Sequence, residues 1–321
     1  MMQQSQKIMT DFQVRKSKKQ KETFRGWLCG ELEAAGYAPK VEKGFAARNV
    51  VAGDPEKAKV IFSAHYDTCA VLPIPNFVTP RNMFFYLCYQ MLLVLAIFVA
   101  VFLAEAAAVV LMKLAGTEPP LWLHMLLGYA LCVFFCWWIL DGPANKHTAN
   151  DNTSGTITLL ETALAMPPED REKVCFVFFD NEEKGLFGSA AFTKAHKKAK
   201  KETPNINFDC VSDGDYIQFF PDKRMKKKNP EMLERIEAAF QGQGEKKTEV
   251  VRGPGFYPSD NKAFKMGVGV CALKHKRIIG YYMDRIHTSR DTVLEEENIQ
   301  LLRDGALRLA AAEKISNQGL T

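Results

Sequence analysis

The sequence predicts an α/β fold, in which a mostly parallel sheet lies between two layers of helices. The first observation behind this prediction is the alternation of short apolar segments with helical patterns along most of the 321 residues. The second is the run VCFVFF at 174–179, which is typical of a parallel strand covered by helices on both faces. The third is the pair Glu182 and Glu183 soon after that run. Open α/β sheets bind ligands at the carboxyl ends of their strands, so this pair marks a candidate site.

Local patterns predict the remaining elements in order. A basic helix is expected over about 11–35, with Gly36 as its C-cap. The segment TSGTITLLETALAM opens with a Thr/Ser cap and stops at Pro167, which defines a second helix. Further strands are expected near 47–52, 59–64, 207–212 and 269–275, and further helices near 187–200, near 230–241 and from about 295 onward.

Composition narrows the possible partners and the compartment. Charged residues make up 25% of the chain and the net charge is +5, a mild basicity that does not indicate a nucleic-acid partner. The eight cysteines form no CxxC pair, and several lie inside apolar segments. This usage is typical of buried thiols in a reducing compartment and not of a disulfide framework.

Two segments, 83–112 and 121–140, depart from a globular pattern. The first has one charged residue, Glu105, among 30 positions, and the second has no Asp, Glu, Lys or Arg among 20. About 20 apolar residues suffice for a helix to cross a bilayer, and the short link KLAGTEPP predicts an antiparallel hairpin. Trp122 and Trp137 suit the two membrane interfaces. A pair of core helices or a hydrophobic dimerisation hairpin is the alternative.

The hairpin divides the chain. Residues 1–80 and 141–321 are expected to form one discontinuous domain, and residues 81–140 an inserted transmembrane hairpin that contacts the lipid bilayer. Both ends of a hairpin lie on one side of the membrane, and that side carries most of the basic residues, whereas the link carries only Lys113. The positive-inside rule therefore predicts an inner or plasma membrane location with the domain in the cytoplasm. A homo-oligomer paired through the hairpin stays open. The basic residues ahead of the first span are Arg15, Lys16, Lys18, Lys19, Lys21 and Arg81.

Other metal-binding residue types follow the predicted strands or precede a predicted helix. They are His65 and Asp67 in HYD, Asp151 in NDNTSG, Asp209 in NFD, and His287 and Asp291 in IHTSRD. Histidine nitrogen and carboxylate oxygen are ligands that zinc accepts. A cation would also offset the crowding of Glu182 and Glu183, with one glutamate as a ligand and its neighbour free as a base.

Six motifs, in order, resemble those of the co-catalytic zinc aminopeptidases. They are HYD, NDNTSG, FFDNEEKGLFGS, NFD, YPSDN and IHTSRDT. That family also includes glutamate carboxypeptidases, glutaminyl cyclases and the transferrin-receptor ectodomain. The resemblance covers nearly the whole chain outside the hairpin. It implies a three-layer α/β/α sandwich with a mixed central sheet.

The resemblance also implies two zinc ions and a hydrolytic site. The implied ligands are His65, Asp151 and Asp209 for one zinc, and Asp151, Glu183 and His287 for the other. Glu182 would be the general base, and Asp67 would lie behind His65 and fix its tautomer. The implied reaction is hydrolysis of a peptide bond beside a free amino terminus. Because the ends of the hairpin lie close to the implied metals, short peptides are expected as substrates in preference to folded proteins.

Two features depart from the family pattern. His65 and Asp151 are 86 positions apart (151 − 65), with the hairpin between these two ligands, and Asn261 stands where relatives commonly have histidine. A single-zinc glutaminyl cyclase-like acyltransferase and a catalytically silent receptor or scaffold are the alternatives. All five implied ligand positions carry a metal-binding residue, which favours an enzyme. The number of metals per chain distinguishes the cyclase from the aminopeptidase.

Overall fold

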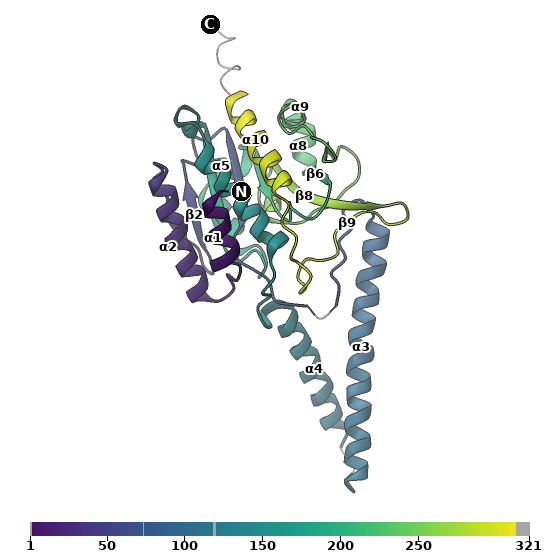
Figure 1. Ribbon diagram of the computed structural model, residues 1–321. Helices are drawn as coiled ribbons and strands as arrows, with labels where there is room; N and C mark the ends of the chain where they lie inside the picture. Colours follow the sequence, from purple (N-terminus) through teal and green to yellow (C-terminus); the bar gives the residue numbers. More distant parts are fainter. Residues whose placement is uncertain (1, 73, 118–119, 313–321) are drawn as a thin grey trace.

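A mixed sheet of nine strands forms the centre of the computed structural model, which describes residues 2–72, 74–117 and 120–312 (Figure 1). The spatial order is β1-β2-β4-β3-β5-β8-β6-β7, with β9 paired to β8. Strands β4, β3, β5 and β8 are parallel, whereas β2 and β6 run antiparallel to this group on its two sides. The strands are β1 (Lys40–Lys43), β2 (Arg48–Ala52), β3 (Val60–His65), β4 (Val174–Phe179), β5 (Asn205–Phe208), β6 (Tyr216–Pro221), β7 (Lys247–Val250), β8 (Gly267–Lys276) and β9 (Gly280–Tyr282).

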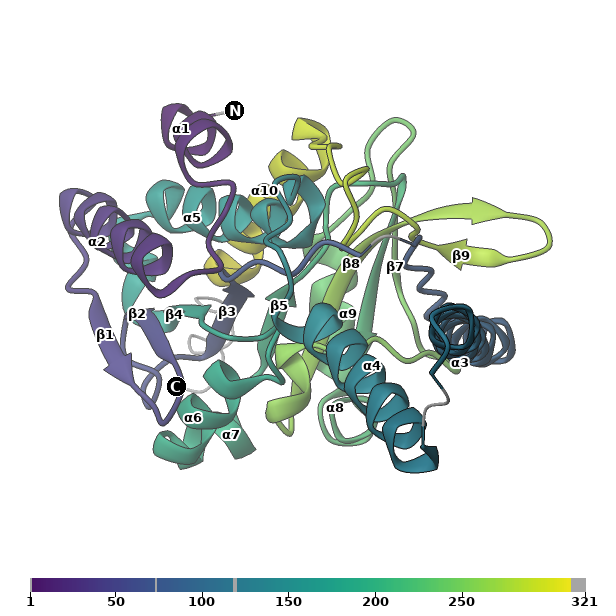
Figure 2. The ribbon, with the colours of Figure 1, turned by 90° about the horizontal axis from the view of Figure 1, so that it is seen from below.

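Helices cover both faces of the sheet. Helices α2, α5 and α10 lie on one face, and α6 and α7 lie on the other (Figure 2). This arrangement confirms the predicted three-layer α/β/α sandwich with a mixed sheet. The helices are α1 (Gln3–Asp11), α2 (Lys18–Ala34), α3 (Met83–Leu114), α4 (Leu121–Asp141), α5 (Gly155–Ala165), α6 (Phe187–Ala195), α7 (Lys197–Lys201), α8 (Lys223–Lys228), α9 (Pro230–Ala239) and α10 (Glu296–Ala312), with the short turns η1 (Ala149–Ser154), η2 (Pro168–Lys173) and η3 (Asp260–Ala263).

Burial of both faces of the sheet explains why the sequence of β4 is continuously apolar. All six of its residues are buried, because side chains alternate between the two covered faces. Phe176 packs toward α2 and α5, and Val177 packs toward α6. The ring of Phe62 in β3 lies between those of Phe176 and Phe208, with centroid distances of 6.0 and 6.1 Å. This packing fixes β3, β4 and β5 side by side, so their carboxyl ends meet at one edge.

Several local predictions were wrong. The basic segment 11–35 is not one helix, because α1 ends at Asp11 and α2 begins at Lys18 after a capping box between Ser17 and Gln20. Between them the chain is not helical, and it buries Arg15, one of the basic residues counted ahead of the first span. The edge strands β1 and β7 were missed because their sequences, KVEK and KTEV, are too polar to be recognised as strands.

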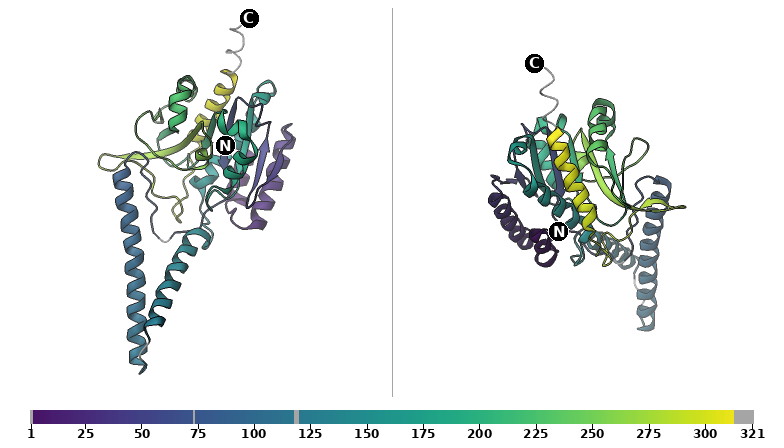
Figure 3. Two further views of the ribbon diagram at one scale, coloured as in Figure 1. Left: turned by 180° about the vertical axis from the view of Figure 1, so that it is seen from behind. Right: turned by 45° about the horizontal axis from the view of Figure 1, so that its top comes forward.

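Helices α3 and α4 project from the domain and converge toward their link (Figures 1 and 3). Both are long and apolar enough to cross a membrane. Val101 is the only buried residue of α3, and α4 has none, so these are not core helices of the domain. Apolar surface on all sides of a helix needs lipid or another protein to cover it.

A glycine at the start of α5 provides a test of this packing. A Cβ atom at Gly155 would overlap the backbone oxygen of Phe208 and the side chain of Asn152. We expect Gly155→Ala to lower the free energy of unfolding by about 2 kcal/mol or more. Gly30 in α2 is the control, because a Cβ there meets no atom within 4 Å, and alanine there should be neutral or stabilising by up to about 1 kcal/mol. Urea unfolding of the detergent-solubilised variants measures both; equal stabilities would contradict this packing.

Candidate metal centre

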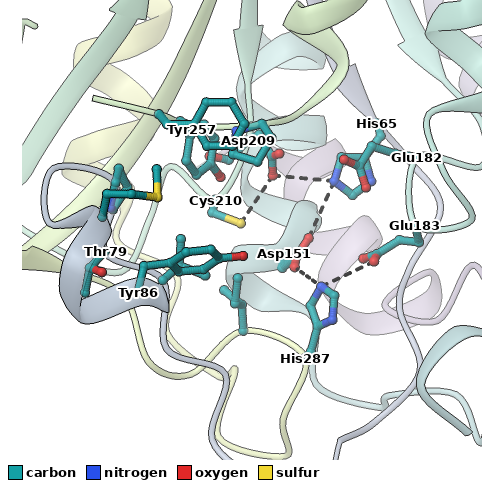
Figure 4. A pocket seen from close by; sticks show the side chains of 16 residues that line it. His65, Thr79, Tyr86, Asp151, Glu182, Glu183, Asp209, Cys210, Tyr257 and His287 are labelled. Atoms are coloured by element: carbon teal, nitrogen blue, oxygen red, sulfur yellow. Dashed lines mark hydrogen bonds and ion pairs between the residues drawn. The ribbon is translucent and has the colours of Figure 1, made fainter. Parts of the chain in front are cut away.

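Three groups of side chains lie together at the carboxyl ends of the parallel strands, at one edge of the sheet (Figure 4). His65 is the last residue of β3, Asp209 directly follows β5, and the two glutamates lie in the loop after β4. The turn η1, ahead of α5, adds Asp151, and the loop after β9 adds His287. Of the seven residues to which the resemblance gave a role, six face one cavity, and the seventh, Asp67, lies behind His65. The cavity-facing residues are His65, Asp151, Glu182, Glu183, Asp209 and His287.

Asp151 lies at the centre of this cluster. One of its oxygens, Oδ1, is 3.5 Å from Nε2 of His65, and the other, Oδ2, is 2.9 Å from Nε2 of His287. Nε2 of His65 is also 3.4 Å from Oδ1 of Asp209. Nε2 of His287 is also 3.2 Å from Oε2 of Glu183. The two carboxylate oxygens of Asp151 therefore face two different sets of metal-binding groups.

Asp67 connects His65 to the glutamate pair. Its Oδ1 lies 3.5 Å from Nδ1 of His65, which directs Nε2 of that ring into the cluster. The carboxylate also accepts hydrogen bonds from the backbone N–H groups of Glu182 and Glu183, at 3.0 and 3.3 Å. Burial favours the neutral form of Asp67, but His65 and Lys21 outweigh it and hold the pKa below its ordinary value. Asp67 is thus an ionised positioning residue, whose two oxygens contact His65 and the backbone N–H groups of the glutamate pair.

The motif NDNTSG holds the neighbouring loops in place. Asn150 Oδ1 accepts hydrogen bonds from the backbone N–H groups of Ser212 and Asp213, at 2.8 and 3.1 Å. Asn152 donates to the backbone oxygen of Phe208 at 3.0 Å, which fixes the end of β5 just before Asp209. The backbone of Asp151 is held from the other side by Asp291, whose Oδ2 accepts its N–H at 3.0 Å. Asp291 is a functional neighbour that sequence analysis noted and gave no role.

The charges of this cluster are unbalanced without a cation. Burial raises the pKa of Glu183 to about 8 and, with repulsion from Asp151, that of Asp291 to about 8. Burial lowers the pKa of His287, yet the carboxylates of Glu183 and Asp151 outweigh it and raise the value to about 10. Oε1 of Glu183 is buried without a hydrogen-bond partner. A nitrogen and oxygen donor set with an unpaired buried oxygen fits zinc.

Two residues near the cluster were not assigned to it from sequence. The thiol of Cys69 lies within 4.8 Å of ligand atoms of Glu183 and His287, close enough for an additional ligand, and its spacing in HYDTCA carries no recognised signature. Arg15 is fully buried and donates to Oγ1 of Thr153 at 3.1 Å. Asn261 packs against Gly269 and is not among the residues that line the cavity.

Residues 139–310 match the family described as Peptidase family M28. The chain belongs to this family. The matched region begins in the last turn of α4 and contains Asp151, Asp209 and the glutamate pair, whereas His65 lies outside it, before the hairpin. The fold thus brings His65 next to side chains of the matched region, although the hairpin separates them in the sequence.

Solved structures with this fold include both peptidases and cyclases. LapA aminopeptidase of Legionella pneumophila is 16% identical, with a TM-score of 0.57 over 96% of this chain and 67% of that one. The glutaminyl cyclase of Porphyromonas gingivalis is 16% identical, with a TM-score of 0.58 over 96% of both chains. A leucine aminopeptidase precursor from Bacteroides thetaiotaomicron is 15% identical, with a TM-score of 0.54 over 95% of this chain and 93% of that one. At this identity the likeness shows the fold alone. Comparison with curated proteins gave no match.

The raised pKa values predict that zinc binding releases protons. At pH 7 the metal-free protein should hold protons on Glu183 and His287, whose pKa values are about 8 and about 10, and ligands must lose them to bind zinc. Titration calorimetry in buffers of different ionisation enthalpy should give a release of about one proton or more per chain. The release should fall at pH 9, where Glu183 is already ionised. Heats that do not depend on the buffer would contradict this charge state.

Proposed function

We propose that this M28 chain is a membrane-anchored aminopeptidase that holds two zinc ions and removes N-terminal residues from short peptides. The observation that carries the proposal is the position of Asp151, whose two oxygens face His65 and His287 separately. A carboxylate that bridges two metals needs this geometry, whereas a single-metal site needs only one of these contacts. The assigned ligands are His65, Asp151 and Asp209 for one zinc, and Asp151, Glu183 and His287 for the other.

The chain's own residues supply the proton transfer. Zinc, when bound, is a Lewis acid that activates water and polarises the scissile carbonyl. Glu182 lines the cavity beside His65 and Glu183, and burial raises its pKa well above the ordinary value. A buried carboxylate of raised pKa can take a proton from the attacking water and return it to the leaving amine. Asp67 positions Glu182 for this task through its backbone N–H.

Glutaminyl cyclase activity is the second candidate function. The likeness to the Porphyromonas gingivalis cyclase supports it, because that match extends over 96% of both chains. The divided contacts of Asp151 favour the two-zinc aminopeptidase, and the number of zinc ions per chain separates the two activities. A silent receptor is disfavoured because all the ligand side chains and Glu182 meet in one cavity.

The hairpin supports the anchoring part of the proposal. The 21 residues of α4 extend about 32 Å as a helix, close to the thickness of about 30 Å of a bilayer core. Where α4 rejoins the domain, Asp141 pairs with Lys16 at 3.5 Å and Lys184 at 2.9 Å. Basic residues at this end of the hairpin favour a cytoplasmic domain, with residues 1–80 and 141–321 as the catalytic unit.

The adjacent glutamates test the assignment of the base. Glu182→Gln should keep its zinc content and lower kcat by about 10²- to 10⁴-fold, because it removes the proton acceptor and no ligand. Glu183→Gln is the matched control of equal chemistry, and it should instead lose zinc. Rates on an aminoacyl fluorophore and zinc per chain are measured on both variants. Loss of zinc in Glu182→Gln with retention in Glu183→Gln would reverse the two roles.

Membrane anchoring has its own test. The full-length chain should sediment with membranes, resist an alkaline wash and require detergent for release, because the apolar surface of α3 and α4 needs lipid. A cysteine introduced at Gly116, in the link, should react with a membrane-impermeant reagent from outside intact cells. Recovery of the chain in the soluble fraction without detergent would refute the anchor, and labelling only after lysis would reverse the orientation.

A further inference from the structure

The hairpin contributes directly to the wall of the cavity that the proposed metal ligands line. Met83 and Tyr86, in the first turn of α3, line it together with Phe256 and the ligand residues. Tyr86 points its hydroxyl toward Asp151 (Figure 4). The cavity volume is about 200 Å³, below the 300 to 1,000 Å³ usual for ligand pockets, so it suits one or two residues of a peptide.

This end of α3 is fixed to the catalytic domain. Asn82 caps the helix by accepting the N–H of Phe85 at 3.0 Å. The ring of Phe77 stacks on Tyr282 of β9 with centroids 5.2 Å apart, and it also contacts Phe85 and Tyr89 of α3 at 5.7 and 5.6 Å. The first two turns of α3 therefore pack on the catalytic domain and form part of the cavity wall.

Helical geometry explains which face reaches the cavity. Phe85 and Tyr89 are four residues apart and share the face that packs on Phe77, whereas Met83 and Tyr86 share the adjacent face. Phe84, between them, is 80% exposed and points away from the domain. The same turn thus offers both a cavity-lining aromatic residue and an exposed one.

The unequal lengths of the two helices put Tyr86 outside the bilayer. Measured from the link, α3 has 32 residues and α4 has 21, so α3 is longer by eleven residues or about 16 Å. If α4 spans the apolar layer, residues 83–93 of α3 emerge on the side of the catalytic domain. Tyr86 then lies in the aqueous compartment of the site.

We propose that Tyr86 is a substrate-binding residue that selects the N-terminal side chain, so that the inserted hairpin is part of the active site. Its ring, with Met83 and Phe256, forms an apolar wall for an aliphatic side chain. The Tyr86 hydroxyl has no hydrogen bond to a described residue, whereas that of Tyr257 is bound to the backbone oxygen of Asp209 at 3.1 Å. The free hydroxyl can therefore donate to the substrate. This inference rests on the proposed aminopeptidase function.

Kinetics on two substrates tests the selection. The zinc-loaded, detergent-solubilised full chain is assayed with leucyl and alanyl fluorophores. Tyr86→Ala should lower kcat/KM for the leucyl substrate about tenfold more than for the alanyl substrate, because both substrates lose the hydroxyl contact but only the larger side chain loses the wall. Tyr86→Phe should keep the leucyl-to-alanyl ratio while raising KM for both by about two- to tenfold. Phe84→Ala is the matched control and should behave as the unmodified chain, with equal zinc content in all.

Binding of the product amino acid separates this inference from the proposed function. Free leucine should raise the Tm of the unmodified chain and of Phe84→Ala more than glycine does, and Tyr86→Ala should lose this difference. If the unmodified chain hydrolyses neither substrate yet shows this pattern, the aminopeptidase function fails and the role of Tyr86 stands. If it hydrolyses both and Tyr86→Ala equals Phe84→Ala in both assays, the role of Tyr86 is refuted.

Discussion

The crowding of carboxylates around Asp151 is the constraint on which the rest of this site depends. Buried negative charges are costly unless they are paired, hydrogen-bonded or bound to a metal. Two of the carboxylates, Asp67 and Asp291, meet this requirement with backbone N–H groups. The ligand carboxylates face histidine and the cavity, and one oxygen of Glu183 has no hydrogen-bond partner. The fold therefore arranges the cluster for cations, and its nitrogen and oxygen donors are ligands that zinc accepts.

Much of this arrangement could be predicted from sequence, because three of the proposed ligands lie directly beside core elements. His65 ends β3 and Asp209 directly follows β5, so the parallel sheet brings these two close, and Asp151 lies just ahead of α5. The supporting contacts could not be predicted. A carboxylate that accepts backbone N–H groups, as Asp291 does, has no sequence signature. The burial of Arg15 depends on an extended segment whose residues favour a helix, and only the folded chain reveals it.

The hairpin shows a different limit of sequence patterns. Its composition identified the two helices and their bounds closely, yet it treated them as an insertion separate from the site. In the folded chain the first two turns of α3 pack on the catalytic domain, where Asn82 caps the helix and the ring of Phe77 stacks on Tyr282. At the other end Trp138 donates to the backbone oxygen of Val71 at 3.1 Å. Both ends of the insertion are thus bound to segments that flank the proposed metal ligands.

The central claim is that Asp151 bridges two metals, and one measurement tests it directly. Crystals of the zinc-loaded protein, recorded at the zinc absorption edge, give the number and positions of bound ions without reference to activity. We predict two anomalous peaks about 3.5–4 Å apart. One should lie between His65 and Asp209 and the other beside Glu183 and His287, with Asp151 between them. A single peak at full occupancy would contradict the bridge and with it the two-zinc aminopeptidase.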